Sequence, residues 1–101
     1  MKLTKTQKEL MCHCIGVQDF GGRKKPKPYR NYFSTGNRFS DIWDDLVRQG
    51  FAIMRDRRKR RGGIYYHLTD KALQYMLDNR SEFLPFDGRI KLLKTMTKLC
   101  D

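Results

Sequence analysis

Apolar side chains recur every three or four residues in several segments of the chain, which is the spacing of amphipathic helices. This pattern predicts helices over residues 4–16, 40–49 and 69–79, and the middle one has the clearest apolar face. Gly50 stands where a left-handed residue would end that middle helix. Hydroxyl side chains near the three starts are candidate N-terminal caps: Thr4 or Thr6, Ser40 and Thr69.

A second pattern, short runs of aromatic and branched side chains, predicts β-strands at residues 51–54 and 64–68. Between them lies a charged turn, residues 55–63, that closes with two glycines, so the strands are expected to pair as a hairpin. Residues 19–28 combine glycines, prolines and lysines, which disfavours a helix and indicates an exposed loop. Residues 34–37 are expected to form a turn.

The last predicted helix covers residues 87–99. Its apolar stripe consists of Ile90, Leu93, Met96 and Cys100. This stripe either packs on the core or pairs with a second copy of the chain to form a homodimer. We expect residues 1–80 to form the main domain, with a basic loop at 19–30 and a hairpin at 51–68, and residues 81–101 to add the C-terminal helix. The elements together predict an α+β fold that is mostly helical, with one small antiparallel hairpin.

The length of 101 residues suits one compact domain with a single core, which needs neither disulfides nor metals. Lys and Arg number 22 against 11 Asp and Glu, a formal charge of +11. Half of the cations lie in two short runs that contain one acid, Asp56, whereas the other residues hold eleven cations and ten acids. Two positive patches on a nearly neutral scaffold favour a polyanionic partner over an ordinary solvated surface. The first run comprises Arg23, Lys24, Lys25, Lys27 and Arg30, and the second Arg55, Arg57, Arg58, Lys59, Arg60 and Arg61.

The order of elements from residue 39 to residue 77 resembles winged-helix DNA-binding proteins of the MarR and PadR type. The similarity lies in residues 46–51 (LVRQGF), in the Arg-rich turn at 55–63, and in residues 66–72 (YHLTDKA). It implies a winged helix-turn-helix fold, with a recognition helix in the major groove and a hairpin, the wing, that sets cations against phosphates or in the minor groove. Residues 3–8 and 29–33 also resemble small uncharacterised bacteriophage proteins, which implies a phage or prophage setting.

These features predict a nucleic-acid-binding protein with duplex DNA as its partner, acting as a phage or prophage transcription regulator or accessory factor. If about half of the eleven clustered cations contacted phosphates, log affinity would fall against log salt with a slope of about −5. Tyr29, Tyr32 or Tyr65 are candidates for ring contacts, the alternative being partly buried core aromatics. The predicted nucleic-acid-binding residues are all members of the two basic runs together with Arg38 and Arg48.

The predicted helix over residues 40–49 carries Asp41, Asp44 and Asp45 on one face, which phosphates would repel. Either DNA contact is left to the wing and the basic loop, or the acidic face binds a basic protein surface. Two alternative functions stay open. The chain is either a protein–protein interaction module, such as a phage-encoded modulator of a host protein, or a binder of RNA or single strands that stacks bases on aromatic rings.

No enzyme activity and no cofactor are expected. The chain has no phosphate-binding glycine loop and no Ser or Cys nucleophile signature. Cys12 and Cys14 point apart on a helix, so we expect buried thiols and a surface His13 in place of a metal site. His67, in a strand, is expected to have a structural role.

Three cysteines, an odd number, fit free thiols in a reducing compartment. Neither a signal peptide nor an apolar run long enough to span a membrane occurs in the sequence. We therefore expect a cytoplasmic protein with no membrane contact, located in the bacterial host cell if it is phage-encoded.

Overall fold

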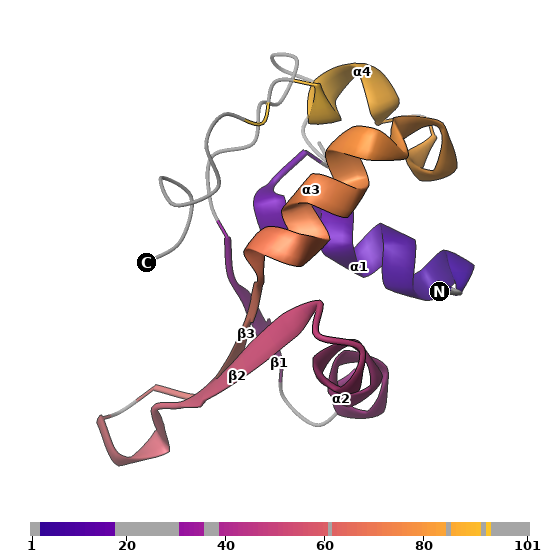
Figure 1. Cartoon of the computed structure of the whole chain (residues 1–101). Helices are drawn as coiled ribbons and strands as arrows, with labels where there is room; N and C mark the ends of the chain where they lie inside the picture. Colours follow the sequence, from indigo (N-terminus) through magenta and orange to yellow (C-terminus); the bar gives the residue numbers. More distant parts are fainter. Residues whose placement is uncertain are drawn as a thin grey trace.

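The computed structural model describes residues 3–17, 31–35, 39–60, 62–84, 86–91 and 93. The fold is α+β, with helices packed against one three-stranded antiparallel sheet (Figure 1). In chain order the elements are α1 (Lys5–Ile15), β1 (Phe33–Thr35), α2 (Ser40–Arg48), β2 (Ala52–Asp56), the 3-10 turn η1 (Arg58–Arg60), β3 (Ile64–Leu68), α3 (Asp70–Asp78), the 3-10 turn η2 (Arg80–Phe83) and α4 (Asp87–Ile90).

Helix α1 begins and ends as its sequence predicts. The Thr4 hydroxyl accepts from the Gln7 backbone N–H at 3.1 Å, and the Gln7 side chain accepts from the Thr4 N–H at 2.9 Å. This reciprocal pair satisfies two backbone donors that a helix start otherwise leaves open. Gly16 ends the helix with a φ of 83°, a left-handed conformation that glycine adopts without strain.

Helix α2 confirms the predicted helix, although its cap was predicted wrongly. Ser40 is the first helical residue, and Phe39 occupies the cap position without a side-chain hydrogen bond. At the other end Gly50 has the predicted left-handed conformation, with a φ of 80°. The chain reversal there lets the Phe51 N–H donate to the Leu46 carbonyl at 2.8 Å, which closes the helix end.

The sheet has the strand order β1-β3-β2, and both neighbouring pairs are antiparallel. The predicted hairpin is confirmed, but β2 continues through Arg55 and Asp56, which were expected in the turn. Strand β1 covers Phe33–Thr35, so residues 34 and 35, expected as the start of a turn, belong to a strand instead. Residues 33–35 pair with residues 64–66 of β3, so their conformation is set by a strand distant in sequence.

The C-terminal helix is shorter than predicted. Helix α4 ends at Ile90, and the Leu93 N–H donates to the Ile90 carbonyl at 2.9 Å, which closes a turn. Gly88 within α4 weakens the helix, because glycine loses more backbone freedom than other residues. Residues 92 and 94–101 lie outside the described part.

Buried apolar side chains of the described residues form one core, which α1, the sheet, α2, α3 and the C-terminal segment share. Its largest fully buried members include Trp43, Phe51 and Phe83. Ile90 and Leu93 belong to the same cluster, so residues on both sides of position 80 share one core. This part of the predicted stripe therefore packs on the core. A homodimer stays a prediction, and Met96 and Cys100 lie outside the described residues.

Candidate nucleic-acid interface

The hairpin β2–β3 projects from the body of the molecule. Helices α1, α3 and α4 gather at one end of the sheet, whereas the tip of the hairpin lies at the other end (Figure 1). At the tip the Arg57 N–H donates to the Gly63 carbonyl at 2.9 Å, and the Gly62 N–H donates to the Arg57 carbonyl at 2.9 Å. A Cβ at Gly62 would lie 2.9 Å from the Arg57 Cβ, so this tight tip requires glycine there.

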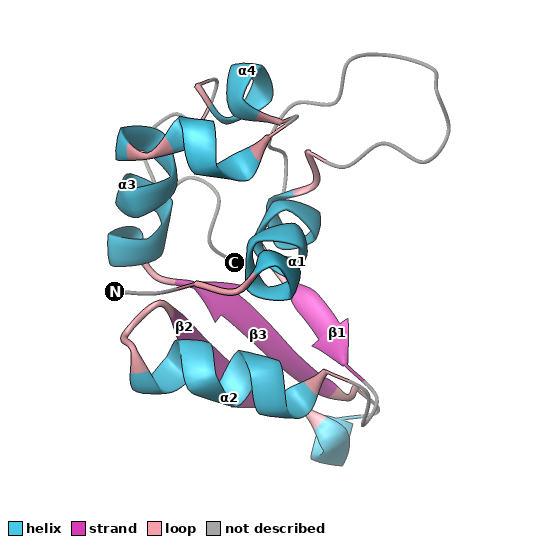
Figure 2. Ribbon diagram, turned by 90° about the vertical axis from the view of Figure 1, so that its right-hand side faces the viewer, coloured by secondary structure: helices cyan, strands magenta, loops and turns pink. Residues whose placement is uncertain are grey.

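The two faces of the sheet have different environments. Trp43 of α2 packs against the rings of Phe33 and Tyr66, each with a centroid separation of 5.3 Å, so α2 covers the face to which these side chains point (Figure 2). Side chains alternate along a strand, which directs Tyr65 and its cross-strand partner Arg55 to the other face. We call this second face the open face, because most side chains on it are exposed: Tyr32, Ser34, Ile53 and Arg55.

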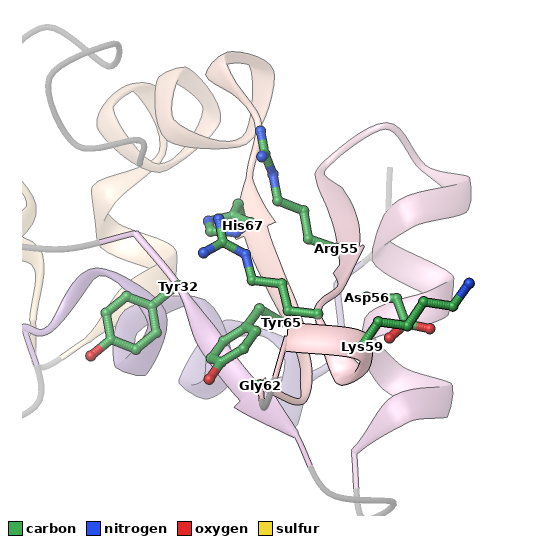
Figure 3. A pocket seen from close by; sticks show the side chains of 8 residues that line it. Tyr32, Arg55, Asp56, Lys59, Gly62, Tyr65 and His67 are labelled. Carbon is green, nitrogen blue, oxygen red and sulfur yellow. The ribbon is translucent and has the colours of Figure 1, made fainter.

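A hollow of about 880 Å³ lies where the open face meets the hairpin tip. We call it the hairpin hollow, and Figure 3 shows its lining side chains. Three of them are exposed cations, and three carry aromatic or imidazole rings. The lining residues are Tyr32, Arg55, Asp56, Arg57, Lys59, Gly62, Tyr65 and His67.

The one carboxylate in the hairpin hollow is already paired. The Arg58 guanidinium contacts both Asp56 oxygens, with Nη2–Oδ2 at 2.6 Å and Nε–Oδ1 at 2.9 Å. These hydrogen bonds from Arg58, with a smaller effect of the nearby Lys59 charge, lower the pKa of Asp56 to about 2. Arg58 and Asp56 thus cancel each other's charge. Within the described part of the chain, no ion pair involves Arg55, Arg57 or Lys59, so the hollow keeps their positive charge.

His67 is held in one orientation at the base of the hairpin hollow. Its side chain is buried, with 5% of its surface exposed, and Nδ1 lies 2.6 Å from the Asn31 carbonyl oxygen. A carbonyl oxygen only accepts, so Nδ1 carries a hydrogen, and in the neutral form of the ring Nε2 is then an acceptor. Nε2 is buried and receives no hydrogen bond from the residues that the structure describes. His67 therefore ties β3 to the segment before β1 through one nitrogen, whereas the other has no hydrogen-bond partner among the described residues.

Two of the three acidic residues on the predicted acidic face of α2 have partners within the fold. Asp45 accepts from the Gln7 side chain at 2.7 Å, which ties α2 to α1, and from Gln49 at 2.8 Å. These two hydrogen bonds lower the pKa of Asp45. Asp44 accepts from the Tyr66 hydroxyl at 2.7 Å, which ties α2 to the sheet. Two of the three carboxylates thus stabilise the fold, and a protein partner at this face stays a prediction.

The structure brings together only part of the predicted site. Arg48 lies on α2, on the side of the sheet away from the open face, and contacts Asp45 at 3.3 Å. Arg60 belongs to η1, but its side chain is outside the described part. Seven further residues of the predicted site lie outside the described part of the chain: Arg23, Lys24, Lys25, Lys27, Arg30, Arg38 and Arg61.

The sequence did not place two of the lining residues in the main predicted site. Tyr65 was an optional ring contact and His67 a structural residue, yet both line the hairpin hollow. The alternation of side chains between the two sheet faces along residues 64–68 could have identified them. Since Tyr66 points at the core, its neighbours Tyr65 and His67 must point to the opposite face. Tyr32, which directly precedes β1 and has 38% of its surface exposed, lies beside them.

The cysteines and His13 give no metal site in the described part of the chain, where no three metal-binding side chains come together. Cys12 and Cys14 are buried thiols, as predicted. His13 was predicted at the surface, but it is half-buried, with its ring 5.1 Å from that of Phe33.

No helix among the described residues has the length and apolar character needed to cross a membrane. Comparison of the chain with protein-family models, with curated proteins and with solved structures gave no match. The function is therefore inferred from the chemistry of the site itself.

Proposed function

We propose that this protein binds nucleic acid and that the hairpin β2–β3 makes the principal contact with the phosphate backbone. The observation that carries this proposal is the hairpin hollow, where Arg55, Arg57 and Lys59 line one surface. All three side chains are exposed, and the only carboxylate beside them in the described part of the hairpin, Asp56, is neutralised by Arg58. A projecting, positively charged tip of this kind fits a polyanion that is itself extended.

Release of counterions supplies the driving force. Each phosphate that a cation neutralises frees bound counterions, so affinity depends steeply on salt and little on base sequence. The open face is continuous with the tip, which lets a strand of nucleic acid contact both. Contact of the hairpin with phosphates is favoured over insertion of α2 into a groove. Asp41 is exposed on α2 and would repel phosphates, and Asp44 and Asp45 already accept hydrogen bonds within the fold.

The finer assignment of the fold as a winged helix belongs to the same proposal. It is supported by the sequence of α2, β2, a basic tip, β3 and α3. One feature departs from the expectation: among the described elements β1 precedes α2 directly, whereas a helix-turn-helix pair would place another helix there. Duplex DNA, phage regulation and accessory roles stay predictions that the resemblance implies.

The test is binding of a fluorescent 20-base-pair duplex and a 20-nucleotide single strand at about 100 mM salt, followed by anisotropy. The variant Arg55→Ala/Arg57→Ala/Lys59→Ala is expected to bind about 10- to 100-fold more weakly, at about 0.5–1 kcal/mol for each exposed ionic interaction that it removes. The matched control, Lys5→Ala/Arg80→Ala/Lys91→Ala, removes the same charge from exposed positions on other elements. It is expected to weaken binding less than about threefold, because charge at a distance is screened. Equal effects of the two variants, or no effect of the hairpin variant, would refute the assigned role.

A further inference from the structure

The hairpin hollow contains more than phosphate binding requires. The rings of Tyr32 and Tyr65 lie 6.3 Å apart between centroids, at an angle of 70° (Figure 3). Tyr32 is exposed and Tyr65 half-buried, and both lie on the open face beside the cations. This arrangement offers the face of one ring and the edge of another to a flat aromatic group, next to positive charge.

His67 adds a directional polar group to the same hollow. Because Nδ1 donates to the Asn31 carbonyl, Nε2 of the neutral ring presents a lone pair and not a hydrogen. A buried acceptor that nothing in the described part of the chain satisfies is uncommon, since such groups are costly to desolvate. Because Nε2 is buried, a ligand contacts it only if the side chains that cover this atom move. The ligand must bring a hydrogen-bond donor, which a phosphate does not have.

We infer that the hairpin hollow holds the base of an unpaired nucleotide, so that the preferred form of nucleic acid is single-stranded. The base stacks on one tyrosine ring and meets the edge of the other. Its amino group donates to His67 Nε2, and the flanking phosphates contact Arg55, Arg57 and Lys59. This inference rests on the proposed function, because the phosphate contacts bring the strand to the hollow. The hairpin hollow, with a volume of about 880 Å³, is large enough for a small ligand such as one base.

A duplex does not offer what the hairpin hollow is built to take. In a paired and stacked base, both ring faces are covered and the Watson–Crick amino group is already hydrogen-bonded. An unpaired base exposes all three features at once. The tyrosines and His67 are therefore used only by single strands, whereas the cations serve both forms.

The experiment compares a dC12 single strand with a hairpin duplex of similar length, for the wild type and two paired variants. Tyr32→Leu/Tyr65→Leu removes both rings, and Tyr32→Phe/Tyr65→Phe keeps them as a matched control. We expect the leucine variant to bind dC12 about 10- to 100-fold more weakly, given the contribution of base–aromatic stacking. Its binding to the duplex, and the binding of the phenylalanine variant to both probes, should change less than about twofold, because the phosphate contacts remain. The fluorescence of Trp43 checks that each variant is folded.

A second variant, His67→Asn, tests the acceptor separately. Its amide keeps a donor for the Asn31 carbonyl and loses the position of Nε2. Cytosine has an amino donor where thymine has a carbonyl acceptor, so the wild type should prefer dC12 to dT12 by about 2- to 12-fold, the value of one hydrogen bond. The variant should show no preference.

The outcomes separate the two proposals. A wild type that binds duplex and single strand equally, with no effect of ring removal, would overturn the inference and leave phosphate binding by the hairpin in place. A wild type that binds neither probe at low salt would overturn both.

Discussion

Asn31 is the residue on which the sheet and the hairpin hollow both depend. Its side chain is fully buried and pairs with the backbone of Leu68 in both directions. The Leu68 N–H donates to Oδ1 at 2.8 Å, and the amide Nδ2 donates to the Leu68 carbonyl at 2.9 Å. The Asn31 carbonyl also accepts from His67, so this one residue fixes the end of β3 and the orientation of the imidazole.

Replacement Asn31→Ala leaves two backbone groups of a buried residue without these partners, since Leu68 is 1% exposed. Each such group costs about 1–3 kcal/mol, so the free energy of unfolding should fall by about 2–6 kcal/mol. A domain of this size has a total stability of about 5–15 kcal/mol, and the variant should therefore be close to unfolding. Asn31→Asp should be at least as destabilising, because a carboxylate cannot donate to the Leu68 carbonyl.

Urea unfolding followed by the fluorescence of Trp43, the single tryptophan and fully buried, measures this decrease. With an m-value of about 1.5 kcal/mol/M, a decrease of about 3 kcal/mol lowers the midpoint by about 2 M. The control is Gln74→Ala, which removes an exposed amide that contacts Asp78 and should change stability by less than about 0.5 kcal/mol. A decrease below about 1 kcal/mol for Asn31→Ala, or one equal to the control, would contradict the reasoning.

Three further predictions concern conformation and ionisation. Gly50→Ala should lower stability by about 1–2 kcal/mol in a thermal melt, because Gly50 has a φ of 80° that a Cβ disfavours. Burial, aided by the hydrogen bond to Asp44, raises the pKa of Tyr66 to about 12 from 10, so its stabilising effect is complete below pH 10 and disappears toward pH 12. Tyr66→Phe should therefore lose less stability than the wild type between those pH values, and an unchanged pH profile would argue against this. Burial also raises the pKa of Cys12 to about 12, so iodoacetamide at pH 8 should label it only after unfolding, as site-resolved mass spectrometry can show.

The helices and the hairpin were predictable because their signals are local. Thr4 and Thr69 cap helices within three residues of themselves, and Gly50 ends one where it stands. Strand β1 was not predictable in the same way, since three residues become a strand only by pairing with β3 some thirty positions later. The end of α4 was not predictable either, because the spacing of apolar residues after Ile90 is compatible with a helix but does not require one.

The charge of the candidate site was visible in the sequence, whereas its geometry was not. The Arg-rich turn could be placed at the tip of a hairpin, but the pairing of Asp56 with Arg58 follows from the shape of the tip. Asp45 accepts a hydrogen bond from Gln7, which lies 38 positions earlier in the chain. The acidic face that suggested a protein partner therefore contains a contact that stabilises the fold. The sequence alone did not show which side chains of β3 lie on the open face, because this depends on Tyr66 being the residue that points at the core.

Phosphate binding by the hairpin cations can be tested through the salt dependence of affinity. In titrations between about 50 and 400 mM salt, we expect a log–log slope for the wild type near −5 on a duplex probe and near −4 on a single-stranded probe. The variant Arg55→Ala/Arg57→Ala/Lys59→Ala should have a slope shallower by about 2.7 on the duplex, at about 0.9 for each phosphate that is no longer neutralised. A wild-type slope near zero, or an identical slope in the variant, would show that these cations do not bind phosphates.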